Sequence, residues 1–170
     1  YDAACKAADA LIAIQNPAGG WNYIGDLAGE ASLKKWYDTI GKNGWRLEEF
    51  QHYYGNATFD DAGTAVASQF LLRMYLERRE ARYLPAVQKA IDFVVNAQFG
   101  PEYGVANGGW PQYYPERSLY RHQITFNDDA MVHVMELLRD VGDGAAPYGF
   151  VDEARRERAR QAVARGVETL

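Results

Sequence analysis

Apolar residues recur at helical spacing in three segments of the chain. In residues 2–15, 83–98 and 151–170 they fall three and four positions apart, with charged side chains on the opposite face. Pro17 and the glycine pair that follows Ala18 end the first segment. Amphipathic helices of this kind cover a core with one face and leave the other face in water. We therefore expect three outer helices.

Two further helical segments are apolar around most of their circumference. They are residues 62–76 (AGTAVASQFLLRMYL) and 129–138 (DAMVHVMELL), and such a pattern is typical of helices enclosed on nearly all sides. Outer and inner helices then alternate along the chain, and strand signals are weak throughout. This order predicts an all-α protein, an (α/α) toroid of alternating inner and outer helices rather than an up-and-down bundle.

Two short motifs occur twice. GGWNY at residues 19–23 returns as GGWPQYY at 108–114, and each copy follows a glutamine, Gln15 or Gln98, at the end of an outer helix. TFDDA at 58–62 returns as TFNDDA at 125–130, and each copy stands just before an inner helix. Self-similarity of this kind indicates stacked structural units. If the inner helices run in the same direction, both acidic segments open at the same end.

Composition narrows the classes of function. The 170 residues are 48% hydrophobic and 24% charged, as expected for one globular core. A net charge of -5 without a basic stripe excludes a nucleic-acid partner, and no run approaches the roughly 20 apolar residues of a membrane span. The lone Cys5 excludes a disulfide framework, and no zinc, phosphate-loop or nucleophile-elbow motif is present. We expect a monomer.

Both ends of the sequence lie inside a helical pattern. The chain starts without a cap and stops without a breaker. We therefore expect residues 1–170 to form part of a single helical-toroid catalytic domain whose C-terminal remainder is absent from this chain.

The acidic pairs before the inner helices have two interpretations. Thr58 and Thr125 each stand three residues before an aspartate, which is the spacing of a capping box. That interpretation leaves the second aspartate of each pair unexplained, because unneutralised neighbouring carboxylates repel. A bound Ca²⁺, which accepts several carboxylate oxygens, removes the repulsion. The acidic residues are Asp60, Asp61, Asp128 and Asp129.

The long connections carry many aromatic residues. Planar rings interspersed with Asn, Gln and Arg suit the faces of sugar rings. The alternative is that several of them plug the loops onto the end of the barrel, and we assign about half of them to that role. The aromatic residues are Trp21, Tyr23, Trp36, Tyr37, Trp45, Tyr53, Tyr54, Trp110, Tyr113, Tyr114 and Tyr120.

These motifs together resemble the polysaccharide lyase family 10 pectate lyases. The resemblance rests mainly on NGGWPQYYP at 107–115, then Tyr120 and His122, then ITFNDDAM at 124–131. The upstream GGWNY and TFDDAGTAVASQFLLRMY are also similar to the family. The resemblance implies an (α/α) toroid enzyme that cleaves polygalacturonate by calcium-assisted β-elimination and releases unsaturated oligogalacturonates.

The resemblance also implies roles for individual residues. Asp60 and Asp128 match the family's two calcium-site aspartates. Asp61 stands where the family more usually has Asn, and Asp129 is at a variable position, so both are secondary metal candidates. The expected substrate-binding residues are Trp110, Tyr113, Asn127 and Arg121, with the two rings shaping the floor of the cleft.

The family's general base is an arginine far C-terminal to the TFND segment. We therefore expect the catalytic base beyond Leu170 and assign no catalytic residue within this sequence. A secreted or periplasmic location is expected, with the signal peptide outside this chain.

Two other functions fit the same residues. An inverting glycoside hydrolase on a related helical toroid would use two carboxylates about 6.5 to 9.5 Å apart as acid and base. A carbohydrate-binding helical module would bind polygalacturonate without cleaving it. The reaction product separates the three, because a lyase creates a C4–C5 double bond and a hydrolase does not.

Overall fold

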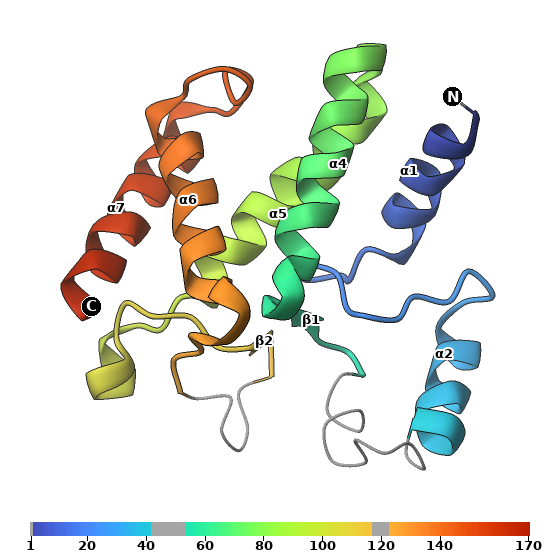
Figure 1. Ribbon diagram of the computed structural model, residues 1–170, viewed down its shortest axis with the longest axis horizontal. Coiled ribbons are helices and arrows are strands. Elements are labelled where there is room, and N and C mark those ends of the chain that lie inside the picture. The colour runs from blue at the N-terminus through green and yellow to red at the C-terminus, as the bar shows by residue number, and fades with distance from the viewer. Residues whose placement is uncertain (1, 42–53, 117–122) are drawn as a thin grey trace.

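The predicted helices are all present. A computed structural model describes residues 2–41, 54–116 and 123–170 (Figure 1). Its long helices begin and end within five residues of the predicted segments. Among the described helices none is long and apolar enough to cross a membrane. The long helices are α1 (Asp2–Ile14), α4 (Gly63–Arg78), α5 (Leu84–Ala97), α6 (Ala130–Asp143) and α7 (Glu153–Thr169).

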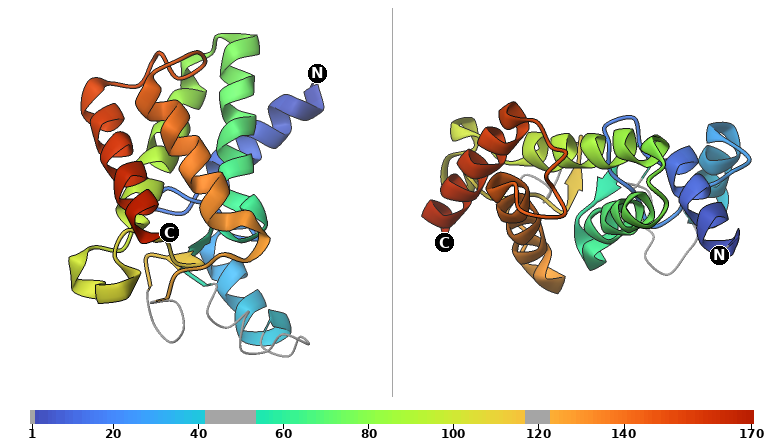
Figure 2. Two further views of the ribbon diagram at one scale, coloured as in Figure 1. Left: turned by 60° about the vertical axis from the view of Figure 1, so that its left-hand side comes forward. Right: turned by 90° about the horizontal axis from the view of Figure 1, so that it is seen from above.

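These helices stack in two layers. Figure 2 shows α4 and α6 in one layer and α5 and α7 in the other. The main packing contacts join α4 to α5 and α6 to α7, and α1 packs against α4. Consecutive helices therefore alternate between the layers from α4 to α7. This confirms the all-α fold with alternating inner and outer helices.

The inner helices are less enclosed than the sequence pattern indicated. Each of them keeps one exposed stripe, which begins at Val66 in α4 and at Val132 in α6. These two valines are 56% and 52% exposed. The prediction that the inner helices are enclosed on nearly all sides is therefore wrong for this stripe, because none of the described helices covers it.

The sequence pattern did not predict the shorter elements. Helix α2 (Glu30–Trp36) lies in the first long connection. Strand β1 (Ala57–Thr58) pairs antiparallel with β2 (Tyr113–Tyr114), so that Thr58 faces Tyr113 and the two long connections are tied together. Segments of two residues are too short to produce an alternating pattern. The other short helical turns are Tyr37–Gly41, Asp60–Ala62, Ala81–Tyr83, Pro101–Ala106 and Asn127–Asp129.

The tryptophan of each Gly-Gly-Trp motif is a core residue. Trp21 is 3% exposed and Trp110 is fully buried. The indole N–H of Trp21 donates to the carbonyl of Leu11 in α1, and that of Trp110 donates to the carbonyl of Val94 in α5, both at 2.8 Å. Each buried indole thus has its hydrogen-bond partner, as Trp requires, and binds the loop to the helix that precedes it.

A glutamine fixes the turn in front of each tryptophan. The Nε2 atom of Gln98 donates to the carbonyls of Gly108 at 2.8 Å and of Ala162 in α7 at 2.7 Å. In the first copy Gln15 makes the same two kinds of bond, to Gly19 at 2.7 Å and to a carbonyl of α5 at 2.8 Å. One side chain therefore joins the end of an outer helix to its own loop and to the next outer helix.

Each Gly-Gly-Trp motif is also bonded to the start of an inner helix. The Thr58 N–H donates to the Trp21 carbonyl at 2.8 Å, and the Thr125 N–H donates to the Trp110 carbonyl at 2.9 Å. The two motif pairs are therefore equivalent in contacts as well as in sequence. The repetition predicted from the sequence is confirmed, and both acidic segments lie at the same end of the molecule (Figure 1).

A buried tyrosine makes the stability of this core sensitive to alkaline pH. Tyr148, between α6 and α7, is 5% exposed, and burial raises its pKa to about 12. The pKa of Tyr148 in the folded state thus exceeds its value of about 10 in the unfolded chain. The contribution of the neutral Tyr148 side chain to the free energy of unfolding is therefore complete below pH 10 and is lost as the pH rises to 12.

We expect Tyr148→Phe to remove this part of the pH dependence. Between pH 10 and 12 the free energy of unfolding of the wild type should fall by roughly 2–3 kcal/mol more than that of the variant. Urea denaturation of the full-length protein at several pH values measures the difference. If the free energies of unfolding of the wild type and the variant changed in parallel between pH 10 and 12, the assignment of this pH dependence to Tyr148 would be contradicted.

Candidate acidic metal centre

Each inner helix begins with two residues in the left-handed conformation. Asp61 and Ala62 have φ of 48° and 54° before α4, and Asp128 and Asp129 have φ of 52° and 54° before α6. Non-glycine residues seldom adopt this conformation, and consecutive ones are rarer still. Backbone strain of this kind is common where side chains are held for a function. Here the two left-handed residues turn the chain sharply, so that the acidic residues lie at the start of the helix.

The backbone conformations support the alignment of the two acidic segments by their threonines. Asp61 has the backbone conformation of Asp128. Asp60 therefore corresponds to Asn127, and Ala62 to Asp129. The threonine three residues earlier fixes this register, because Asp61 and Asp128 stand at the same distance from Thr58 and Thr125.

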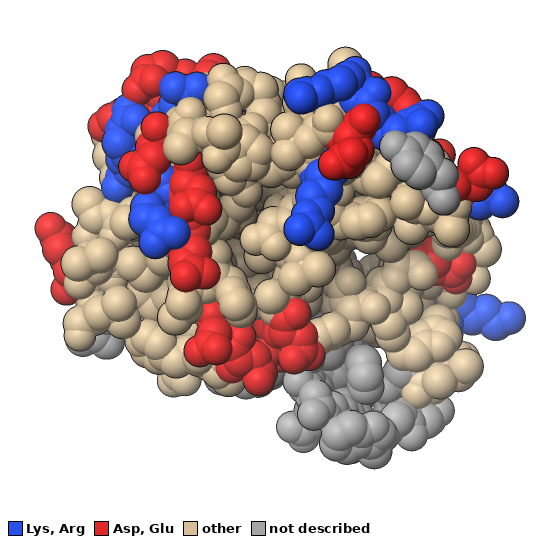
Figure 3. Space-filling model, turned by 45° about the horizontal axis from the view of Figure 1, so that its top comes forward, with Lys and Arg blue, Asp and Glu red and all other residues tan. Residues whose placement is uncertain are grey.

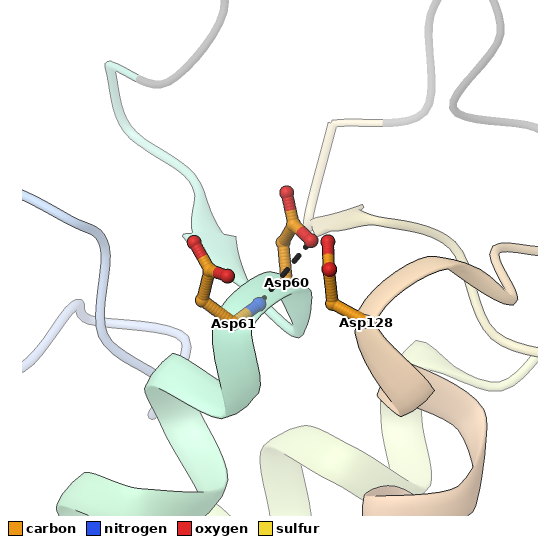
Figure 4. A group of neighbouring side chains, drawn as sticks. All are labelled: Asp60, Asp61 and Asp128. Carbon is orange, nitrogen blue, oxygen red and sulfur yellow. Dashed lines mark hydrogen bonds between the residues drawn. The ribbon is translucent and has the colours of Figure 1, made fainter.

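Three carboxylates converge at this end of the molecule. One oxygen from each of Asp60, Asp61 and Asp128 lies within 4.8 Å of the other two. Figure 4 shows the three side chains on the same side, beyond the starts of α4 and α6. In the space-filling view, acidic side chains gather over these helix starts, apart from the lysine and arginine side chains of that face (Figure 3). We call these three residues the carboxylate cluster.

Asp60 is the buried member of the carboxylate cluster. It is 5% exposed, whereas Asp61 and Asp128 are exposed. Its Oδ2 accepts a hydrogen bond from Gln112 Nε2 at 2.6 Å, and its Oδ1 accepts from Asn127 Nδ2 at 2.9 Å. The backbone N–H of Asp61 donates to the same Oδ1 at 3.2 Å (Figure 4). Buried carboxylates need partners of this kind, and here they come from both connections.

The capping interpretation is wrong for these aspartates. Neither α4 nor α6 has a side-chain hydrogen bond at its N-cap. The Thr58 hydroxyl instead accepts from the Asp60 N–H at 3.0 Å and donates to the Gln112 carbonyl at 3.2 Å. The left-handed pair removes the aspartate from the first turn of the helix, so its carboxylate is directed to the cluster.

Several predicted site residues have other positions. Trp110 and Tyr113 are fully buried, so neither ring can shape a cleft floor or contact a sugar, and that prediction is corrected. Asp129 is not a member of the carboxylate cluster. Asn127 adjoins the cluster, and its Nδ2 lies 3.2 Å from Asp128 Oδ2 as well. Arg121 lies outside the described residues.

Several other loop aromatics pack onto the ends of the helices, as the alternative interpretation predicted. Trp45, Tyr53 and Tyr120 lie outside the described residues. Trp21 and Tyr37 are only 3% and 4% exposed, so these loop aromatics are core residues.

Two residues beside the cluster were missed by sequence reasoning. Gln112 lies within the repeated motif, but nothing in the sequence links it to Asp60. Phe126, which precedes Asn127, is 58% exposed and is the aromatic ring with open surface in the TFNDDA segment. Its counterpart Phe59 is buried against Phe93, with ring centroids 5.2 Å apart. The sequence signal was the same for both phenylalanines, and only the packing distinguishes them.

The donor set of the carboxylate cluster fits a hard cation. The ion pairs between described residues involve none of its three carboxylates. Three carboxylates this close repel one another unless a positive charge lies between them. Oxygen ligands from carboxylates suit Ca²⁺ in particular, which tolerates irregular geometry. The arrangement can therefore hold a divalent cation with its outer side open to a ligand.

A cavity of about 440 Å³ lies elsewhere in the described part of the chain. It is enclosed by the loop after α1, by α2 and by the segment before β1, and no residue of the carboxylate cluster lines it. The carboxylate cluster is therefore separate from that cavity.

The protein therefore belongs to the class of helical-toroid proteins. Its candidate cation site is the carboxylate cluster at the start of the inner helices. A family model described as pectic acid lyase matches residues 25–170. The chain therefore belongs to the pectic acid lyase family. The resemblance to family 10 lyases found in the sequence is confirmed. No curated protein matched the chain.

Two solved structures have the same fold. A family 10 polysaccharide lyase from Cellvibrio cellulosa aligns with a TM-score of 0.71 and 24% sequence identity. A mutant of a family 10 polysaccharide lyase from the same organism, in complex with trigalacturonic acid, aligns with a TM-score of 0.71 and 26% identity. Each alignment covers 98% of this chain and 45% of the other, so the chain spans less than half the length of these lyases.

Proposed function

We propose that the protein containing this chain is a pectate lyase that cleaves polygalacturonate by calcium-assisted β-elimination. The carboxylate cluster is the observation that carries the proposal, because it assembles three oxygen-donor side chains at one end of a fold built by a lyase family. The trigalacturonic acid bound to the related Cellvibrio mutant supports an acidic polysaccharide as the substrate.

Asp60, Asp61 and Asp128 would hold the calcium ion. When bound, the ion supplies positive charge that neutralises the uronate carboxylate and makes the adjacent C5 proton easier to remove. The protein contributes the position of the carboxylates. Asp60 is fixed by its buried hydrogen bonds, and the exposed Asp61 and Asp128 leave the outer side accessible to a polymer.

The catalytic base is proposed to be an arginine C-terminal to Leu170, as the family resemblance implies. An arginine removes a proton only if its pKa is lowered strongly by burial or by neighbouring cations. Because polygalacturonate is a polymer that does not cross a membrane freely, we also propose that the enzyme is secreted or periplasmic.

The geometry favours the lyase over an inverting hydrolase. The carboxylates of the cluster bring oxygens within 4.8 Å of one another. An inverting enzyme needs its two carboxyl groups about 6.5 to 9.5 Å apart to admit a water molecule. A shared cation requires the closer arrangement.

The product of the full-length protein tests the proposal. With polygalacturonate and Ca²⁺ we expect rising near-ultraviolet absorbance from the C4–C5 double bond, and we expect EDTA to abolish it. Added Ca²⁺ in excess of the EDTA should restore the rate. Saturated reducing ends without absorbance would indicate a hydrolase, and binding without either product would indicate a carbohydrate-binding module.

A further inference from the structure

We propose that Gln112 and Asn127 are positioning residues that hold the Asp60 carboxylate in place for the cation. The inference rests on the proposed function, because it concerns the same carboxylate cluster. It assigns a role to two amide side chains that were not among the expected metal ligands.

The two amides hold Asp60 from two separate points of the connection between α5 and α6. Gln112 follows the second Gly-Gly-Trp motif, and its side chain donates to Asp60 Oδ2 at 2.6 Å. Asn127 precedes α6 and donates to Asp60 Oδ1 at 2.9 Å. Because each oxygen has its own donor, the carboxylate plane is fixed in orientation as well as in position.

Gln112 is itself held against the segment that carries Asp60. It is 7% exposed, and its backbone carbonyl accepts the Phe59 N–H at 3.0 Å and the Thr58 hydroxyl at 3.2 Å. The backbone and the side chain of Gln112 therefore both bind residues 58–60. Because Gln112 is already held in this way, Gln112 and the Asp60 carboxylate that it supports lose little conformational freedom when a cation binds, which favours binding.

The comparison of the two motif copies explains why Asn127 is an amide. Asn127 occupies the place that Asp60 has in the first copy. A carboxylate at both places would set a fourth negative charge beside Asp60, whereas the amide donates a hydrogen bond without adding charge. The asymmetry of the repeat thus leaves a cluster of three carboxylates with a neutral support.

Calcium affinity without substrate tests this inference. We expect Gln112→Met, which keeps the shape but removes the donor, to weaken Ca²⁺ binding by roughly 10- to 100-fold, as loss of an outer hydrogen bond does at metal sites. Isothermal titration of the full-length protein with CaCl₂ measures the dissociation constant. Gln161→Met on α7, whose side chain donates to Glu157 away from the cluster, is the matched control and should keep the wild-type value.

A second variant keeps the test decisive if Gln112→Met does not fold. Asn127 is exposed, so Asn127→Ala should fold and also weaken Ca²⁺ binding about tenfold. A merely structural role would lower the stability of the variants but leave the dissociation constant of the folded protein unchanged, and that result would overturn the inference.

The titration also separates this inference from the proposed function. Absence of Ca²⁺ binding to the wild type overturns the inference directly. Normal Ca²⁺ binding with weakened variants, but without an unsaturated product, would uphold the positioning role and reject the lyase activity.

Discussion

Asp128→Asn should lower the rate of polygalacturonate cleavage by the full-length enzyme about 100-fold or more at saturating Ca²⁺. The substitution keeps an oxygen at nearly the same place but removes one of the three negative charges of the carboxylate cluster. A cation held by fewer charges gives less stabilisation to the charge that develops on the substrate. The initial rate of increase in near-ultraviolet absorbance measures the effect.

The matched control for this variant lies on the helix that follows Asp128. Asp140→Asn removes one exposed carboxylate from α6, but Asp140 pairs with Arg139 away from the cluster. We expect it to keep the wild-type rate. If Asp128→Asn were nearly as active as Asp140→Asn, the assignment of the metal site would be lost.

Gly108→Ala should destabilise the full-length protein by about 3 kcal/mol or more. Gly108 has a φ of 90°, which L side chains rarely adopt. A Cβ atom at this position would lie 2.5 Å from the carbonyl oxygen of Arg165 in α7, which is backbone and cannot rotate away. The free energy of unfolding by urea measures the loss.

Gly55→Ala separates the conformational cost from the steric one. Gly55 has a φ of 77°, close to that of Gly108, but among the described residues no atom beyond its chain neighbours lies within 4 Å of a Cβ built there. We expect a cost of about 1 kcal/mol, from the backbone conformation alone. Equal losses in the two variants would show that the contact with α7 contributes nothing.

The helices could be predicted because their signals are local. The positions of apolar residues, and breakers such as Pro17, depend only on neighbours a few residues apart, and they located the long helices closely. The alternation of layers followed from the same pattern. The exposed stripe that begins at Val66 and Val132 could not be predicted from the pattern. The pattern indicates which helix faces are apolar, but not which faces are covered by other helices.

The candidate site could be predicted only in part. The repeated TFDDA and TFNDDA segments identified the acids, and the order of the helices indicated that they meet. The burial of Trp110 and Tyr113 and the hydrogen bond from Gln112 to Asp60 depend on contacts between distant residues. No local pattern encodes such contacts.

Local sequence patterns are enough to define the helical architecture, the repeated motifs and the acidic residues, and with them the family to which the chain belongs. Which of the acids share a site depends on the tertiary packing. The left-handed residues at the start of α4 and α6 bring Asp61 and Asp128 together, and two amides from the connection between α5 and α6 hold Asp60 beside them. Convergence of this kind is set by the packing of segments far apart in the chain, so it becomes visible only when those segments are in contact.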